Sequence, residues 1–442
     1  MDESSPSPAA GESDSPQSGI ALWLAILASG LLVGGLSVAF HAGLDFALRQ
    51  REQLTFWAKP LGAAGALLLV AVCAIAVGLA VWMTGRFAPL AAGSGIQHVE
   101  GVERGVVKLW PLSVVWVKFV GGILGIGGGL VLGREGPTVQ MGASLAEHLG
   151  ARFGLSSAAR RNLLVVGAGA GLAGAFNAPL AGTLFVVEEL KCPLHPAIYL
   201  GTLLASVVTD LCCRFWLGQA PELALPRELP PPLLMLAPVV LVGALGGVIG
   251  VIFNAVLMRA LVLMDRCKQR VPAWMLGVAM GVVLGGVAWF VPALPGGGVV
   301  FAARVLDGGI STAAALWLLP LSFVLTIGSY AIGAPGGIFA PLLVLGALLG
   351  LLFHGAWLAV LPAPTAAMPV LAAAAMAALF AGVVRAPLTG AVLLVEMTGS
   401  YAIVLPLILA SLAAYAVAEA LGNPPIYESL LQRELRRLQA ST

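Results

Sequence analysis

Four Gly- and Pro-rich breaks interrupt the apolar stretches of this 442-residue chain, and they hold most of the residues that could do chemistry. They are 93–97 (Gly-Ser-Gly-Ile-Gln), 133–137 (Gly-Arg-Glu-Gly-Pro), 177–179 (Asn-Ala-Pro) and 333–341 (Gly-Ala-Pro-Gly-Gly-Ile-Phe-Ala-Pro). In all but the third, a small residue precedes a run that restarts as helix, so free N–H groups carrying about half a positive charge point inward. Several such ends together predict an anion site that needs no lysine or arginine. Partial charges also hold the anion loosely enough to release it.

Buried acids are the second group of candidates. An ionised carboxylate inside a membrane is costly, so acids there are rare and usually functional. Close packing of helices explains the glycines of 121–129, but it does not explain Arg134 and Glu135 in the second break. We expect Glu188 and Glu396 to be structural carboxylates bonded to backbone or arginine, since buried charges pair. For Glu189, the residue type alone leaves a structural role and proton transfer equally favoured.

Composition indicates what must position these breaks. Hydrophobic residues make up 59% of the chain and charged residues 10%, against about 25% charged in soluble proteins. Stretches such as 20–40, 61–83, 233–257 and 275–293 are each long enough to cross a bilayer, which takes about 20 apolar residues. We therefore predict an all-α integral membrane protein with one transmembrane domain at 19–427. A disordered acidic tail is expected at 1–18 and a short polar tail at 428–442.

An internal repeat divides that domain. Residues 133–142 share their Gly and Pro positions with 337–346 at an offset of 204, and 173–182 match 381–390 at an offset of 208. The second match places Glu188 opposite Glu396. Two matches in the same order predict homologous halves, about 20–220 and 230–421, with many tilted and broken transmembrane helices. Such repeats often have inverted topology and a substrate site at their interface.

Taken in order, the motifs resemble a known family. Gly-Ser-Gly-Ile at 93–96, Gly-Arg-Glu-Gly-Pro at 133–137 and Gly-Gly-Ile-Phe-Ala-Pro at 336–341 are similar to motifs of the CLC family of chloride channels and chloride/proton antiporters. The resemblance extends through 177–182, 188–189 and 396–401 and covers nearly everything from about 20 to 427. It corresponds to the prokaryotic type, without C-terminal regulatory domains.

The resemblance implies a function. The protein would be a secondary active antiporter that exchanges chloride and similar halides for protons, and not an enzyme. It would be a homodimer with one pore per subunit in the inner membrane of a bacterium, with no cofactor, metal or nucleic-acid partner. The alternative is a passive voltage- or pH-gated chloride channel, which shares the anion site but lacks obligatory proton coupling.

The resemblance also implies roles for single residues. Glu135 would be the external gate and proton acceptor, and Glu189 the internal proton acceptor typical of antiporters. The anion-binding residues would be Ser94 and Tyr401 through their hydroxyls, Ile338 and Phe339 through their amides, and Gly133, Arg134 and Gly136 at the second break. Where the family usually has proline, this chain has Gln97, whose side-chain amide lies close to Ser94 in sequence and is a candidate selectivity modifier.

One rival comes from the enzyme class. Residues 163–174 contain the pattern G-x-G-x-x-G after an apolar run, which is the dinucleotide-binding fingerprint. That fingerprint needs a βαβ unit and an acid about 20 residues further on. The stretch here is continuous with a Gly- and Ala-rich membrane helix, so a membrane oxidoreductase is not favoured.

Overall fold

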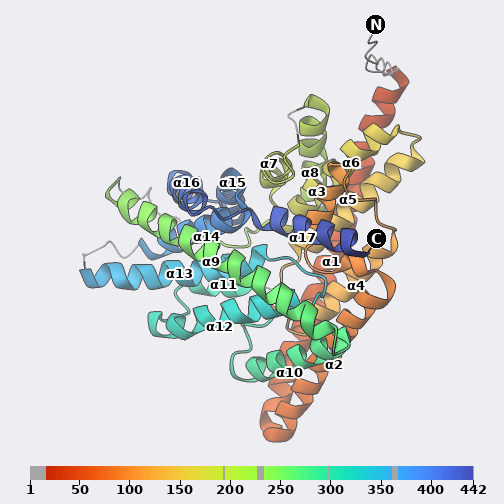
Figure 1. Ribbon diagram of the computed structural model, residues 1–442. Helices are drawn as coiled ribbons and strands as arrows, with labels where there is room; N and C mark the ends of the chain where they lie inside the picture. The colour runs from red at the N-terminus through yellow and green to blue at the C-terminus, as the bar shows by residue number, and fades with distance from the viewer. Residues whose placement is uncertain (1–15, 193–194, 226–232, 297, 361–366, 442) are drawn as a thin grey trace, which may run out of the picture.

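The computed structural model describes residues 16–192, 195–225, 233–296, 298–360 and 367–441, and over these ranges the chain is helical without any strand (Figure 1). The first half contains α1 (Pro16–Ala58), α2 (Ala63–Phe87), α3 (Ile96–Glu103), α4 (Ser113–Gly127), α5 (Glu135–Arg152), α6 (Ser157–Phe176), α7 (Pro179–Glu188) and α8 (Pro196–Leu217). The second contains α9 (Leu236–Lys268), α10 (Ala273–Phe290), α11 (Gly298–Leu306), α12 (Thr312–Ala331), α13 (Phe339–Val360), α14 (Ala367–Val384), α15 (Pro387–Thr398) and α16 (Val404–Ala420). The chain ends in α17 (Ile426–Ser441).

Membrane-length helices alternate with short ones. Among the described residues, eight helices are long and apolar enough to span a bilayer: α1, α2, α8, α9, α10, α12, α13, and α16 with the turn before it. Others are apolar but short. α7 has 10 residues, or about 15 Å, half of a hydrocarbon core of about 30 Å. Short helices of this kind must end at membrane depth. The predicted all-α membrane fold with broken helices is therefore confirmed.

The repeat is visible in where helices begin. α5 begins at Glu135 and α13 at Phe339, which are equivalent at the offset of 204, and α7 begins at Pro179 and α15 at Pro387, which are equivalent at 208. The halves interlock, because α10 of the second half packs along α2 of the first. In Figure 1, α17 runs from the second half back over the first, where it contacts α3.

The dinucleotide-binding rival fails on local structure. Residues 163–174 lie inside the continuous helix α6, whereas the fingerprint requires a strand and a turn before its helix. The glycines serve close packing instead. A Cβ at Gly171 would lie 2.3 Å from the Thr138 carbonyl oxygen of α5, and one at Gly167 would lie 2.4 Å from that of Gly142. Only glycine lets these two buried helices approach so closely.

The tails differ in part from the prediction. Residues 1–15 lie outside the described residues, so most of the expected disordered tail does too. α1 begins at Pro16, so residues 16–18, which the prediction assigned to the tail, are helical. The polar segment 428–441 forms most of α17, and its Glu428, Arg433 and Glu434 pair with Lys191, with Asp265 of α9 and with His98 of α3.

Candidate anion site

Three of the breaks meet at the centre of the bundle. Gly133 and Gly337 exchange two backbone hydrogen bonds, with N···O distances of 2.9 and 2.8 Å. Beside them, the Gly93 N–H donates to the Ala334 carbonyl and the Gly336 N–H donates to the Gly93 carbonyl. These bonds satisfy backbone groups that hydrocarbon could not. Since Gly133 and Gly337 are repeat partners, the two halves join through equivalent residues, with the first turns of α3, α5 and α13 starting next to the junction.

Glu135 occupies the N-terminus of α13. Its side chain is fully buried, and its Oε1 accepts a hydrogen bond from the Phe339 N–H at 2.7 Å. Oε2 is buried with no hydrogen-bond partner. A Cβ at Gly133 would lie 2.0 Å from Oε2, and one at Gly337 would lie 2.2 Å from Oε1. The carboxylate therefore sits in a pocket that only glycines can form, where partly charged amides would hold a free anion.

Ser94 lies directly beside this pocket. A Cβ at Gly136, in the first turn of α5, would lie 2.5 Å from the Ser94 hydroxyl oxygen. That hydroxyl is buried and unpartnered, while the Ser94 N–H points at the Tyr330 hydroxyl, 3.4 Å away. The structure thus brings Ser94, Glu135, Gly133, Gly136 and Phe339 together; Ile338, the neighbour of Phe339, is also fully buried.

The structure places Tyr427 beside Phe339 and Tyr401 apart from it, so Tyr427 is the better candidate for the tyrosine of the site. The Tyr401 side chain is 79% exposed and lines a separate cavity with Asn177 and Arg214. Tyr427 is fully buried in the first turn of α17, with its ring centroid 5.9 Å from that of Phe339. Its hydroxyl is unpartnered and lies near Ser94. A signal was present in the Pro-Pro-Ile sequence before Tyr427, which puts an apolar turn at the start of an amphipathic helix.

Two buried hydroxyls lie close together at this place. Those of Ser94 and Tyr427 have no hydrogen-bond partner other than each other among the described residues, and leaving a buried polar group unpaired costs about 1–3 kcal/mol. Both can donate a hydrogen bond. Together with the amides at the start of α13, they form a donor set suited to an anion.

Lys118 is a second residue that the sequence reasoning missed. It lies on α4 with an exposed fraction of 0%, and its ammonium donates to the carbonyls of Gly93 and Ser94, at 2.8 Å each. Within the described ranges, no carboxylate forms an ion pair with it. A lone lysine in the apolar run 113–127 was the available signal. Lys118 therefore holds the Ser94 loop next to the candidate anion site.

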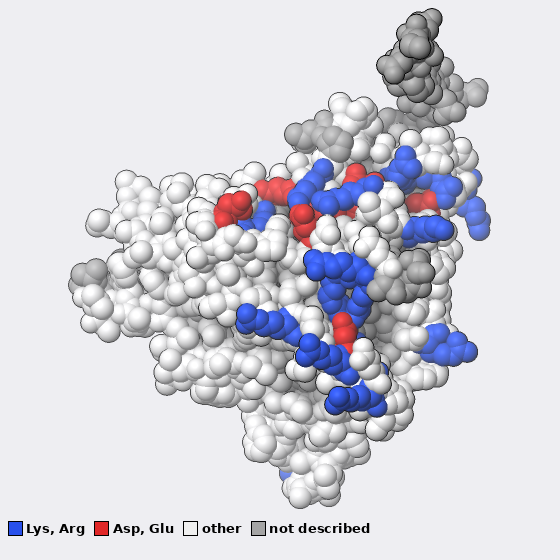
Figure 2. Space-filling model, in the orientation of Figure 1, with Lys and Arg blue, Asp and Glu red and all other residues white. Residues whose placement is uncertain are grey.

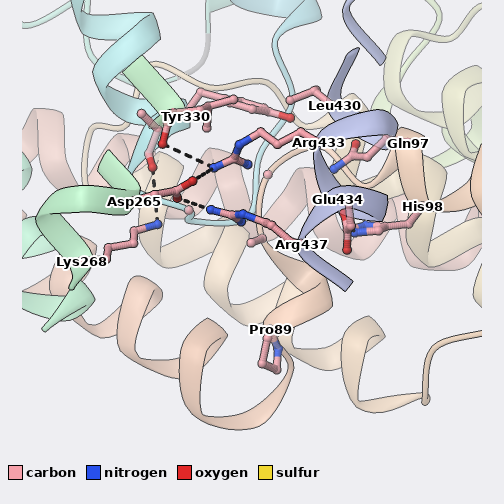
Figure 3. Close-up of a pocket in the computed structure, with 15 residues that line it drawn as sticks. Pro89, Gln97, His98, Asp265, Lys268, Tyr330, Leu430, Arg433, Glu434 and Arg437 are labelled. Atoms are coloured by element: carbon pink, nitrogen blue, oxygen red, sulfur yellow. Dashed lines mark hydrogen bonds and ion pairs between the residues drawn. The ribbon is translucent and has the colours of Figure 1, made fainter. Parts of the chain in front are cut away.

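The Arg134 side chain bonds away from the Glu135 pocket, and Gln97, the candidate selectivity modifier, lines a cavity beside the Ser94 loop. The Arg134 side chain donates to the Ala175 carbonyl at 2.8 Å and pairs with Glu222, so its guanidinium is already engaged. Arg134 itself is the residue before the first turn of α5. Gln97 is buried, its Oε1 has no partner, and it lines a cavity of about 350 Å³ beside the Ser94 loop (Figure 3).

Glu189 lies at the C-terminal end of α7 and is buried. Its charged surroundings include Glu100, Lys191 and Glu428. Lys191 pairs with Glu428 at 2.8 Å, and this hydrogen bond holds the pKa of the Glu428 carboxyl below its usual range. Tyr427, the neighbour of Glu428, is near both Glu135 and Glu189. Both glutamates therefore lie near the first turn of α17.

Glu188 and Glu396 have the structural role that we predicted. The Glu188 carboxylate accepts from the backbone N–H groups of Leu388 and Thr389, at 3.0 and 2.6 Å. The Glu396 carboxylate accepts from those of Leu180 and Ala181, at 3.0 and 2.8 Å. Each acid caps the helix that carries the other, α15 for Glu188 and α7 for Glu396. The pair joins the two halves reciprocally.

A polytopic bundle whose broken helices, drawn from two repeated halves, enclose a buried anion site defines a class of anion-transporting membrane proteins. The sequence profile described as the voltage gated chloride channel family matches residues 76–419, and the chain belongs to this family.

Its relatives agree along nearly the whole length. The chain is 38% identical to the H(+)/Cl(−) exchange transporter ClcA of Vibrio vulnificus (strain YJ016), over 94% of this chain and 90% of that protein. It is 37% identical to the ClcA of Salmonella typhimurium, over 93% and 88%. Among solved structures, a slow cyanobacterial Cl⁻/H⁺ antiporter matches with a TM-score of 0.88 and 34% identity, over 96% and 99% of the two chains. A eukaryotic CLC transporter, at 22% identity and a TM-score of 0.78, shares the fold.

Proposed function

We propose that this protein is a secondary active antiporter that exchanges chloride and similar halides for protons, with Glu135 as the gate of the outer anion site. One observation carries the proposal: the Glu135 carboxylate accepts the Phe339 N–H at the start of α13, the position that suits a free anion. The related exchangers and the 34%-identical antiporter structure support proton exchange over a passive channel.

The mechanism follows from the charge of one side chain. Ionised Glu135 holds the outer site itself and excludes chloride. Protonated, it loses the charge that the helix N-terminus stabilises, so it leaves the site and chloride enters. When Glu135 returns ionised, it displaces the anion and releases its proton. Anion and proton movements are thereby coupled without a large domain motion.

The roles of the other site residues follow from the groups that surround them. Ser94 and Tyr427 donate their hydroxyls to a central chloride, and the amides of Ile338 and Phe339 complete the site. Glu189 accepts protons on the inner side, among acids and bases that connect it to the protein surface. Gly133 and Gly136 make room for the gate, and Gln97 modifies selectivity from the inner cavity.

The proposal extends to the assembly. The protein works as a homodimer with one pore per subunit in the inner membrane of a bacterium. The transport cycle converts no substrate chemically and uses no cofactor.

A flux assay on purified protein in liposomes tests the proposal. An outward or inward chloride gradient should drive protons uphill in the opposite direction, and bromide should replace chloride. A chloride flux that never moves protons against their gradient would instead identify the passive channel. A protein that moves no halide would refute both alternatives.

A further inference from the structure

The cavity beside the Ser94 loop is lined by several charged side chains, and their net charge affects any anion inside it. It lies between α3, α9, α12 and α17 and has a volume of about 350 Å³ (Figure 3). Gly93 and Tyr330 line it, and the Tyr330 hydroxyl is 3.4 Å from the Ser94 N–H. The cavity therefore leads to the anion site. Under the proposed function, on which this inference rests, it is the inner mouth of the chloride path.

The ionised groups of the mouth nearly cancel. Its charged lining residues are Asp265 and Lys268 of α9, and Arg433, Glu434 and Arg437 of α17. Asp265 accepts from Arg433 at 2.5 Å and pairs with Arg437. Three cations against two carboxylates leave a net charge of +1 while His98 is neutral. Lys and Arg side chains also gather around α17 on the face shown in Figure 2. In so small a cavity, one further charge changes the local anion concentration substantially.

His98 is the histidine among the lining residues, and histidine is the side-chain type that serves as a switch at physiological pH. It lies on α3 with an exposed fraction of 3%. Its Nε2 is 2.6 Å from the Glu434 carboxylate of α17, and its Nδ1 is 3.4 Å from Nε2 of Gln140 on α5. The same Gln140 nitrogen is 3.2 Å from the Leu90 carbonyl. The Nδ1 contact fits an imidazole that accepts from the Gln140 amide, while Nε2 faces the Glu434 carboxylate.

Protonation of His98 conflicts with this arrangement. A proton on Nδ1 would face the Gln140 amide N–H, so the amide must turn to present Oε1, which is buried and unpartnered. That amide packs on the Ser94 loop, since a Cβ at Gly95 would lie 2.1 Å from Gln140 Oε1. The change at His98 therefore reaches the residue next to Ser94. It also adds a positive charge to the mouth and strengthens the tie between α3 and α17.

We propose that His98 sets the affinity of the inner mouth for its anion, and that protonation of His98 raises this affinity. The other titratable and charged groups facing it from neighbouring elements are Glu434, Arg433 and Arg437 of α17, Asp265 and Lys268 of α9, and Tyr330 of α12. On the other side of α3, Glu147, Arg160 and Arg161 line a separate cavity with Val102. Histidine is the one side-chain type in this set whose unperturbed charge change falls between pH 5 and 8.

The test measures the chloride KM at symmetric pH, in liposomes that carry Glu135→Gln so that the gate no longer titrates. Values at about pH 7.5 and about pH 5.5 bracket the ordinary histidine pKa of about 6.5. Acidification should lower the KM about threefold, the size expected for one added charge at partly screened distance. His98→Gln should remove this shift and His98→Arg should keep the KM low at both pH values. His148→Gln is the matched control, because His148 bonds the Ser144 carbonyl outside this cavity and the shift should persist.

The outcomes separate the two proposals. If wild-type protein moves no chloride, the proposed function is overturned, and this inference with it. If chloride transport is normal but His98→Gln retains the full pH shift, this inference alone is overturned. The same holds if His98→Arg shows the wild-type pH shift. A merely structural tie would lower the stability of the His98 variants and leave the pH dependence of KM in place.

Discussion

Two pairs of glutamates differ in how they relate to the internal repeat. Glu188 and Glu396 are equivalent at the offset of 208, and each accepts two backbone N–H groups from the other half. Glu135 and Glu189 have no acidic counterpart. The residue equivalent to Glu135 is Phe339, at an offset of 204, and the residue equivalent to Glu189 is Met397, at 208.

This difference distinguishes acids that hold the structure together from acids proposed to act in transport. The acids present in both halves join the halves, so symmetry is retained where the two halves share one task. Of the acids present in one half, Glu135 lies at the candidate anion site and Glu189 lies at the C-terminal end of α7. At Glu135 the two equivalent positions have different tasks, because one half supplies the carboxylate and the other supplies the Phe339 N–H that binds it. We infer that proton coupling arose where the repeat lost its symmetry.

Among substitutions that test the difference between the two pairs of glutamates, we expect Glu189→Gln to have the largest effect on transport. Glu189→Gln keeps the shape and removes titration, so chloride-driven proton transport should fall to background while chloride flux continues. Its chain neighbour is the matched control: Glu188→Gln should leave the proton-to-chloride ratio unchanged. Both are read from proton uptake and chloride efflux in the same liposomes. Proton pumping that survives Glu189→Gln would assign the inner acceptor elsewhere, with Glu100 the next residue to test.

Lys118 should give the next largest effect, since it too belongs to one half. Lys118→Met leaves the carbonyls of Gly93 and Ser94 without their donor. Two lost hydrogen bonds of about 1 kcal/mol each release the Ser94 loop, so we expect chloride affinity to fall at least about tenfold. Calorimetric titration with chloride measures it. The exposed Lys108→Met is the control, and equal affinities in the two variants would contradict the role given to Lys118.

Comparing Tyr427 with Tyr401 tests which tyrosine binds chloride, and the expected change in affinity is smaller than at Lys118. Removing the Tyr427 hydroxyl should weaken chloride binding about fivefold, the value of one hydrogen bond of about 1 kcal/mol. Tyr401→Phe should change nothing, because that ring is exposed and lies outside the site. The same titration compares the two variants. A loss of affinity in Tyr401→Phe alone would restore the sequence prediction.

The smallest effect on transport is expected at the symmetric pair. Glu188→Gln and Glu396→Gln each weaken the cap of one helix in the opposite half, at about 1–2 kcal/mol. The melting temperature in detergent should fall by a few degrees in each variant, with the proton-to-chloride ratio unchanged. A change in this ratio without a change in melting temperature would break the distinction between the two pairs.

Sequence reasoning reached the parts of the site that local motifs encode. The breaks at 93–97, 133–137 and 333–341 combine glycine, proline and helix-forming residues in a local order, so Ser94, Glu135 and Phe339 could be placed together before any fold was known. Glu188 and Glu396 followed from the repeat. Tyr427 did not, because it reaches the site only when α17 folds back over the first half. Lys118 was missed since its partners are backbone carbonyls, which leave no pattern in the sequence.

The most direct test of the central claim is proton transport by Glu135→Gln. This substitution mimics the protonated gate permanently, so the outer site can no longer be closed by a carboxylate or deliver a proton. The measurement is chloride efflux and proton uptake from liposomes between about pH 4 and 8, where buried carboxyls commonly titrate. Wild-type flux should rise as pH falls, and at saturating chloride the variant should move chloride at a rate independent of pH with no proton movement. If Glu135→Gln still drives protons uphill on a chloride gradient, the gate mechanism proposed for this protein is wrong.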